Sequence, residues 1–407
     1  MKIQFYGRKR FMDIIRGKTD CSPEETGYDE SRIDKLNERL ISMTERRIIH
    51  GAAYCICHKG KIIASGAVGR NNMLGENVPM QPDTVFETAS LTKVFTATAV
   101  MQLVEDGILN LNDAVGKYLP QFAKEPFAGI KLIHLLTHTS GLYPDGGCFD
   151  ESFPKDHWTL IKEAAKLEGD DDLDWISAGI SSGLRRAPGA EWQYCSFGFV
   201  LLGEIISRAS GTDVHDYIEK NILMPLGLKD SGFYLNKDTA ARCFVYSERF
   251  REYIEKIVSG EKSGREGNGD FWDKIPQTGG GLGSTVYDLA RFGDTFANGG
   301  RSGSVRLLGR KSVEKMSKVQ LCGVPDHCWG ANEPNRLYGI GFDIRRTPSF
   351  TYSDRTIMHE GAGASSLDID LEEHLTAAWF VPFDEGAGGW SAEPLYNVQN
   401  IIWSGII

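Results

Sequence analysis

The residues best suited to chemistry lie close together, with Ser90 followed three positions later by Lys93. The apolar pattern of residues 90–107 predicts a helix, and a spacing of three places two side chains on the same helix face, one turn apart. The Ser90 hydroxyl and the Lys93 amine can therefore meet, and a serine becomes an effective nucleophile when a base or a cation lies beside it. Because the first N–H groups of a helix lack helical partners, the N–H of Ser90 could also donate to a developing oxyanion.

The Ser-x-x-Lys spacing alone is a weak signal, because it recurs by chance and also describes a serine N-cap followed by a solvated lysine. Four further segments accompany FETASLTKVFTATAVMQLVEDGILNLNDAVGKYLP around Ser90, in the order LLTHTSGL (135–142), PGAEWQYCSFGFVLLGEIISRASG (188–211), GGGLGSTVYDLARFG (279–293) and HEGAG (359–363). Together they resemble the serine β-lactamase-like and penicillin-binding-protein superfamily, in particular its class C β-lactamase, D-aminopeptidase and family VIII esterase branches. The resemblance runs from about residue 22 to residue 382.

The resemblance implies a catalytic role for three of these side chains. It makes Ser90 the nucleophile that carries the acyl group, Lys93 its partner on the helix, and Tyr194 the residue whose phenol removes the Ser90 proton. An isolated phenol titrates at about 10, so Tyr194 needs nearby positive charge, which Lys93 and a charged His359 would supply by lowering its pKa. A core aromatic is the alternative interpretation of Tyr194.

His359 and Gly361 stand where many members of this superfamily have Lys-Thr-Gly on a strand of the sheet. His359 would hydrogen-bond the tyrosine hydroxyl or the substrate and could become charged near neutral pH, although a surface histidine before a glycine turn is the alternative. Gly361 would let the substrate approach the strand closely. The N–H of Ala362 would be the second oxyanion donor.

Two departures from the superfamily pattern narrow the expected substrate. Ser196 replaces the asparagine that usually follows the tyrosine in the substrate-binding motif, and His359 replaces a lysine that suits the carboxylate of β-lactams and D-Ala peptides. We therefore expect hydrolysis of a small ester, amide or peptide through an acyl-Ser90 intermediate, with weak or no β-lactamase activity. The alternatives are an acyltransferase or transpeptidase that uses the same intermediate, and a ligand-binding protein that keeps the fold without turnover.

The sequence predicts no cofactor and no metal. His134 and His138 are four residues apart, as in a metal pair on a helix, but a third ligand and an adjacent glutamate are missing, so we interpret both as structural. Cys55 and Cys57 alternate in an apolar, strand-like run, which favours core residues over zinc ligands. The glycine runs match neither a dinucleotide fingerprint nor a P-loop, and no Gly-x-Ser-x-Gly elbow of an α/β-hydrolase occurs.

The composition, with 41% hydrophobic and 25% charged residues among 407, is that of a globular protein. A net charge of −10 without a basic cluster argues against nucleic-acid binding, which leaves a small molecule as the expected partner. Eight scattered cysteines favour reduced thiols in the cytoplasm. Residues 1–21 lack a secretory apolar core, so this leader segment is expected to dock or fray, or to form a basic amphipathic helix, without a stable membrane anchor. The oligomeric state is left open.

The order of the predicted elements indicates an α+β fold of the β-lactamase/transpeptidase-like type. One antiparallel sheet built from both chain ends is suggested by strand-like runs at 52–58, 61–68, 338–344, 366–370 and 376–382. Helical patterns flank it at 30–44, 90–107, 196–210, 286–298 and 392–403. We expect an α/β subdomain of residues 22–88 plus 276–407 and an inserted helical subdomain of residues 89–275, together one catalytic domain. The polar stretch 248–275 is expected to be an exposed insertion or loop.

Overall fold

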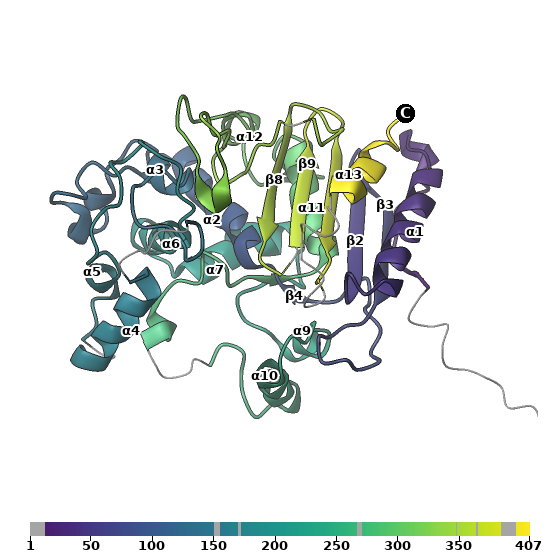
Figure 1. The fold of residues 1–407 in the computed structure, drawn as a ribbon, viewed down its shortest axis with the longest axis horizontal. Helices are drawn as coiled ribbons and strands as arrows, with labels where there is room; N and C mark the ends of the chain where they lie inside the picture. Colours follow the sequence, from purple (N-terminus) through teal and green to yellow (C-terminus); the bar gives the residue numbers. More distant parts are fainter. Residues whose placement is uncertain are drawn as a thin grey trace, which may run out of the picture.

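The computed structural model describes residues 13–149, 155–169, 172–266, 271–346, 348–363, 365–383 and 396–407. A six-stranded antiparallel sheet has the order β1-β3-β2-β10-β9-β8 (Figure 1). Its strands come from both parts of the chain: β1 (Ile15–Arg16), β2 (Gly51–His58), β3 (Lys61–Gly69), β8 (Thr356–Gly361), β9 (Ser365–Asp370) and β10 (Leu375–Phe380). Strand β2 pairs with β10, which joins the two halves. The predicted α+β fold, with a sheet completed by both chain ends, is therefore confirmed.

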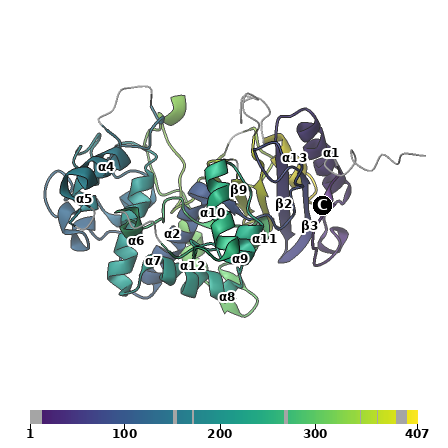
Figure 2. The ribbon, with the colours of Figure 1, turned by 90° about the horizontal axis from the view of Figure 1, so that it is seen from below.

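Helices cover both faces of this sheet, because strands such as β2 are buried along their whole length. The helices α1 (Ser31–Glu45) and α13 (Tyr396–Trp403) lie together on one face, and α11 (Val286–Ala297) lies on the other (Figures 1 and 2). In α1 the buried side chains recur every three or four residues, as on one face of a helix: Ile33, Leu36, Leu40 and Met43. Cys55 and Cys57 share the opposite face of β2 and are buried there, as predicted.

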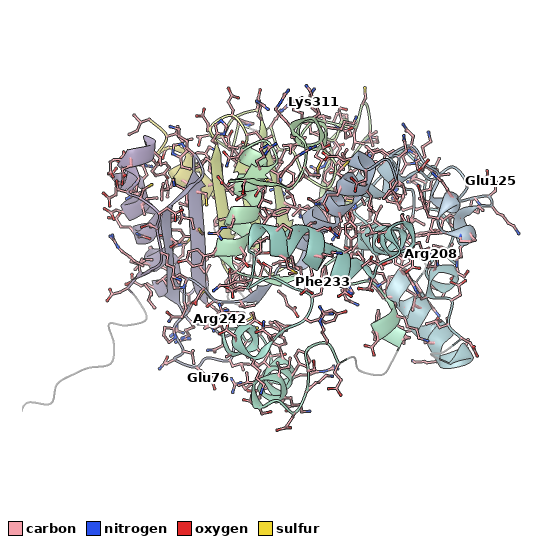
Figure 3. The ribbon with its side chains drawn as sticks, turned by 180° about the vertical axis from the view of Figure 1, so that it is seen from behind. Glu76, Glu125, Arg208, Phe233, Arg242 and Lys311 are labelled. Atoms are coloured by element: carbon pink, nitrogen blue, oxygen red, sulfur yellow. The ribbon has the colours of Figure 1, made fainter. Side chains whose placement is uncertain are left out.

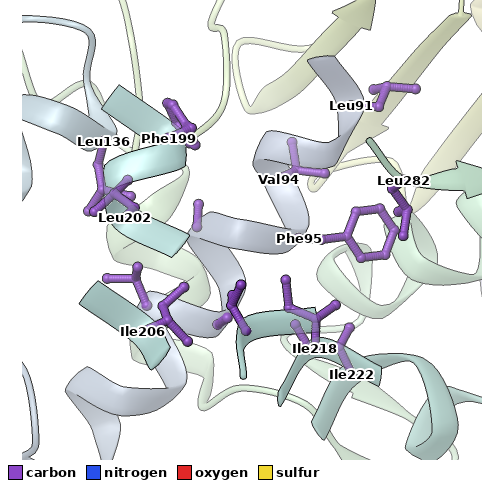
Figure 4. Packing of buried hydrophobic residues seen from close by; sticks show 14 of the residues in the cluster. Leu91, Val94, Phe95, Leu136, Phe199, Leu202, Ile206, Ile218, Ile222 and Leu282 are labelled. Atoms are coloured by element: carbon purple, nitrogen blue, oxygen red, sulfur yellow. The ribbon is translucent and has the colours of Figure 1, made fainter. Parts of the chain in front are cut away.

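A helical lobe stands beside the sheet and is built around α2 (Thr92–Glu105), which is buried on nearly every side. Figure 4 shows Val94 and Phe95 on α2, with Phe199, Leu202 and Ile206 of α6 (Ser196–Ser210) packed beside them. The remaining helices are α3 (Leu132–Leu136), α4 (His157–Glu168), α5 (Trp175–Gly179), α7 (Val214–Ile218), α8 (Met224–Leu226), α9 (Lys237–Ala241), α10 (Glu248–Ser259) and α12 (Arg310–Met316). Short strands are β4 (Phe86–Glu87), β5 (Gly283–Ser284), β6 (Arg301–Ser302) and β7 (Val305–Arg306).

The strand predicted at residues 338–344 is wrong. Only isolated bridges occur there, between Tyr338 and Asp343 and between Asp343 and Met358. Gly341 has a φ of +72°, a left-handed conformation that turns the chain back, so the apolar alternation cannot continue as a strand.

The interpretation of residues 248–275 as a loop is also wrong for the first half of that stretch. Helix α10 occupies Glu248–Ser259, and its Ile254 and Ile257 are buried against Val85 and Cys243. Spacings of three and four apolar residues were present in the sequence but were outweighed by the glycines and charges that follow them.

The two ends of the chain extend the sheet layer. Ile15 and Arg16 form the edge strand β1 against β3, so this part of the leader is neither frayed nor helical, whereas residues 1–12 lie outside the described residues. Helix α13 begins at Tyr396, and the earlier part of the predicted final helix also lies outside the described residues. In the described part of the chain, none of the helices is both long and apolar enough to cross a bilayer.

Candidate active site

Ser90 lies where the chain turns from strand β4 into helix α2. The residue before it, Ala89, has a left-handed φ of 46°, and a short 3₁₀ turn, Ala89–Leu91, leads into the helix. The N–H of Thr88 donates to the carbonyl of Leu282 at 2.9 Å, which ties this turn to the segment before β5. Ser90 is half-buried, so its hydroxyl is held at the edge of the lobe.

Lys93 lies one helical turn after Ser90, and its side chain is fully buried. Its Nζ donates to Ser90 Oγ at 2.9 Å and to the carbonyl oxygen of Gly279 at 2.7 Å. Burial lowers the pKa of Lys93 to about 8, against the attraction of Asp145. The structure thus brings together the pair that the spacing predicted, with an amine that can lose its proton close to neutral pH.

Tyr194 precedes α6 and reaches the same pair. Lys93 Nζ lies 4.9 Å from the centre of the Tyr194 ring, and the phenol hydrogen-bonds with Ser90. Burial, with Tyr338 as a further cause, raises the pKa of Tyr194 well above its usual value, although the Ser90 contact lowers it. The prediction of a lowered phenol pKa is therefore wrong, because the cost of burying a phenolate exceeds the effect of the neighbouring amine.

The buried His138 holds Tyr194 and the following residue in place. The His138 ring stacks on Tyr194 with centroids 4.4 Å apart, and its Nδ1 accepts a hydrogen bond from the N–H of Cys195 at 3.1 Å. His134 has a separate structural partner, since its Nδ1 accepts from the N–H of Lys131 at the start of α3. Both histidines therefore make the structural contacts that we expected, and the described residues contain no group of three His, Cys, Asp or Glu side chains placed to hold a metal ion.

Asp145 is a member of the site that the sequence did not reveal. One carboxylate oxygen accepts from the N–H of Ser196 at 2.7 Å, and the other accepts from the Ser196 hydroxyl at 2.5 Å. The N–H of Asp145 in turn donates to the carbonyl of Tyr194 at 2.8 Å. Asp145 thereby fixes the residues on either side of Cys195 and places a negative charge that raises the pKa of Lys93.

His359 lies on β8 across from the tyrosine, with the two ring centroids 6.4 Å apart. Its Nδ1 lies 2.7 Å from the carbonyl of Glu360, and since a carbonyl can only accept, Nδ1 carries the hydrogen and Nε2 is left as an acceptor. Burial and then Lys93 lower the pKa of His359 to about 4. The expectation that His359 becomes charged near neutral pH is therefore wrong, because a second cation beside Lys93 in a buried site is unfavourable.

Gly361 and Ala362 follow at the end of β8. A side chain at Gly361 would meet the carbonyl oxygen of Thr88 at 2.1 Å, so this glycine allows the strand to approach the turn before Ser90. The close approach predicted at Gly361 is thus made by the protein's own backbone, where a substrate had been expected. Ala362 is exposed beyond the strand, and its part in an oxyanion site stays a prediction.

The comparisons with known proteins agree with this arrangement. The family model described as Beta-lactamase matches residues 33–392. The chain belongs to the β-lactamase family. Members of this family are generally serine hydrolases, and the predicted superfamily is confirmed.

Individual members of the β-lactamase family differ in name and length. Penicillin-binding protein 4* of Bacillus subtilis is 32% identical over 310 residues, which are 74% of this chain and 60% of that protein. Esterase EstB of Burkholderia gladioli is 32% identical over 220 residues, which are 50% of this chain and 51% of EstB. The solved structure of EstCE1, described as a hydrolase with promiscuous acyltransferase activity, has a TM-score of 0.69 and 18% identity over 92% of this chain and 98% of that one, a likeness that shows the fold.

A buried ion network lies behind the strand that carries His359. Asp343 accepts from Arg336 at 2.7 Å and from Arg345 at 2.9 Å, and Arg345 also binds Glu360 at 2.6 Å. Although burial raises it, the pKa of Asp343 is held below its usual value by the two guanidinium groups. Each arginine in this network is therefore engaged by carboxylates of the protein itself.

Proposed function

We propose that this member of the β-lactamase family is a serine hydrolase that forms an acyl-enzyme on Ser90 and cleaves small, uncharged esters or amides. The observation that supports this most directly is the 2.9 Å contact between Lys93 Nζ and Ser90 Oγ, made by a buried amine whose pKa is about 8. An exposed lysine would stay charged at neutral pH and could not accept the serine proton.

In this mechanism neutral Lys93 removes the Ser90 proton while Oγ attacks the carbonyl carbon of the substrate. A bond from Oγ to carbon forms, and the carbonyl electron pair becomes an oxyanion facing the N–H groups of Ser90 and Ala362. On collapse the bond to the leaving group breaks, and the leaving group takes a proton from the Tyr194 phenol, which regains one from Lys93. Because its pKa is raised, Tyr194 acts as a proton donor in this step. A water molecule that loses its proton along the same route then releases the acid from Ser90.

The charges around the site support an uncharged substrate. His359 is neutral above a pKa of about 4, and Arg336 and Arg345 are bound to carboxylates. A substrate carboxylate, as in β-lactams and peptides ending in D-Ala, would have to displace one of these ion pairs. Weak or no β-lactamase activity follows. Among the named relatives, an esterase, EstB, matches half of this chain at 32% identity, which also favours ester hydrolysis.

The test compares wild type, Ser90→Ala and the control Ser181→Ala, which removes an exposed serine hydroxyl elsewhere in the lobe. Each is incubated with 4-nitrophenyl acetate, a D-amino-acid anilide and a chromogenic cephalosporin, and covalent adducts are measured by intact mass. We expect ester turnover by wild type and Ser181→Ala, and loss of turnover and adduct with Ser90→Ala. Turnover that survives in Ser90→Ala would exclude the mechanism. An adduct without turnover would favour a ligand-binding protein or, if an added amine or alcohol restores turnover, an acyltransferase.

A further inference from the structure

A large open pocket lies between helix α10 and the segment that leads into α9. Its volume is about 890 Å³, and its walls include the aromatic side chains of Phe233, Tyr246, Phe250, Tyr253 and Trp272. Phe233 lies in the part of the molecule from which α9 and α10 project (Figure 3). The Tyr246 and Phe250 rings stack with centroids 4.4 Å apart, and Tyr246 keeps 38% of its surface exposed. Stacked aromatic walls of this size are typical of sites for organic ligands.

The pocket adjoins the nucleophile. Its wall includes Glu87, three residues before Ser90, so the two Cα atoms are at most about 11 Å apart along an extended chain. Its wall also includes Gly281, whereas the carbonyl of Gly279 accepts from Lys93. The chain between Lys93 and the pocket is thus a run of three glycines, and a Cβ added at Gly280 would meet the backbone of Ala89 only at 3.8 Å. Side chains of residues 279–281 therefore do not obstruct the route from Ser90 to the pocket.

The charges of the lining favour an uncharged occupant. Four basic and four acidic side chains line the pocket, so their formal charges cancel: Arg249, Lys256, Lys262 and Arg265, with Glu87, Glu252, Glu266 and Asp273. Arg265 is engaged by Asp216 and Glu219, and the Glu87 carboxylate hydrogen-bonds with Tyr246. An aromatic or otherwise bulky apolar group can stack on the rings without having to be charged itself.

The position of Tyr194 indicates which part of the substrate enters. The leaving group must lie against the phenol that protonates it, and the Tyr194 ring is surrounded by Trp192, Trp329 and His138. The acyl part of the same substrate lies on the other side of the attacked carbon, towards the glycines. Resting on the proposed function, we propose that the pocket between α10 and Phe233 binds the acyl group of the substrate, and that this group is bulky, aromatic and uncharged.

The experiment measures kcat/KM with esters that differ on one side only. The acyl pair is 4-nitrophenyl 2-naphthoate and 4-nitrophenyl acetate, and the alcohol pair is 2-naphthyl acetate and 4-nitrophenyl acetate. Tyr246→Ala removes a pocket wall, Gly280→Val narrows the route from Ser90, and Val258→Ala, an exposed change on α10 away from the pocket lining, is the matched control. Gly280 does not have a positive φ, so valine is compatible with its backbone. Ratios of variant to wild type cancel the intrinsic reactivity of each ester.

We expect Tyr246→Ala and Gly280→Val to lower kcat/KM for the naphthoate about ten-fold and for both acetates less than about two-fold, with Val258→Ala changing neither. If the naphthyl acetate loses more than the naphthoate, or all three esters lose equally, the assignment of the acyl group is wrong. If Ser90→Ala still hydrolyses the naphthoate, the proposed function itself fails. Should Tyr246→Ala not fold, as judged by its thermal transition, Gly280→Val alone decides the outcome.

Discussion

The two walls of the candidate site treat their ionisable groups in opposite ways. On the lobe side, burial is the largest cause of the shifts that lower the pKa of Lys93 to about 8 and raise that of Tyr194. On the sheet side, the deeply buried Asp343 has a pKa below its usual range, because Arg336 and Arg345 bind it. Both walls are buried, so the difference lies in whether each charge has an opposite charge in contact with it.

This difference separates proton transfer from a fixed field. A lysine without a carboxylate in direct contact can exchange its proton near neutral pH, as a general base must. Arginines paired with carboxylates keep their charge at every pH of interest and make no proton available. The lobe wall is therefore suited to move protons at Ser90, and the sheet wall is suited to orient the substrate and to select it by charge.

The largest expected effect comes from removing the amine of the lobe wall. Lys93→Met keeps an unbranched side chain but cannot accept the Ser90 proton, so we expect kcat/KM for 4-nitrophenyl acetate to fall about 10³-fold. In wild type the pKa of Lys93 is lowered to about 8, so the neutral base forms as pH rises and kcat/KM should increase through about pH 8. The pH profile of the variant should lose this rise. Lys117→Met, at an exposed ion pair with Asp113, is the control, and an unchanged rate in Lys93→Met would mean that another group is the base.

A smaller effect is expected from the charge that opposes the shift of Lys93. Asp145→Asn keeps the shape of the side chain but removes a negative charge that raises the pKa of Lys93. The pKa of Lys93 should fall further, and the rise of kcat/KM with pH should move to lower pH. We expect kcat at its plateau to fall by about ten-fold, the cost of a weakened charge-assisted hydrogen bond.

Ser196→Ala separates the charge of Asp145 from its contacts. This variant removes the hydroxyl that donates to Asp145 but leaves the carboxylate and the N–H of residue 196 in place. Its pH midpoint should match wild type even if kcat decreases. Equal midpoints for Asp145→Asn and wild type would assign Asp145 a structural role only.

The same contrast explains which features were predictable from the sequence. Ser90 and Lys93 meet because a spacing of three on a helix leaves little choice, and the sheet follows from apolar strands at both chain ends. Asp145 could not be predicted, because it contacts Ser196 through a loop that lies 51 residues away along the chain. The errors on Tyr194 and His359 concern burial, which shifts a pKa by more than the neighbouring charges that the sequence suggested.

The smallest expected effect comes from opening the sheet wall. Glu360→Gln removes one of the two carboxylates that bind Arg345 and leaves Asp343 in place, so the guanidinium gains positive potential next to His359. For monoesters that carry a free carboxylate, kcat/KM relative to a neutral ester should rise by about five-fold, the scale of one partly exposed ion pair. The gain should disappear at high salt, since screening weakens a partly exposed charge. An unchanged ratio would mean that Arg345 does not reach the substrate and that the selection against carboxylates depends on the neutral His359 alone.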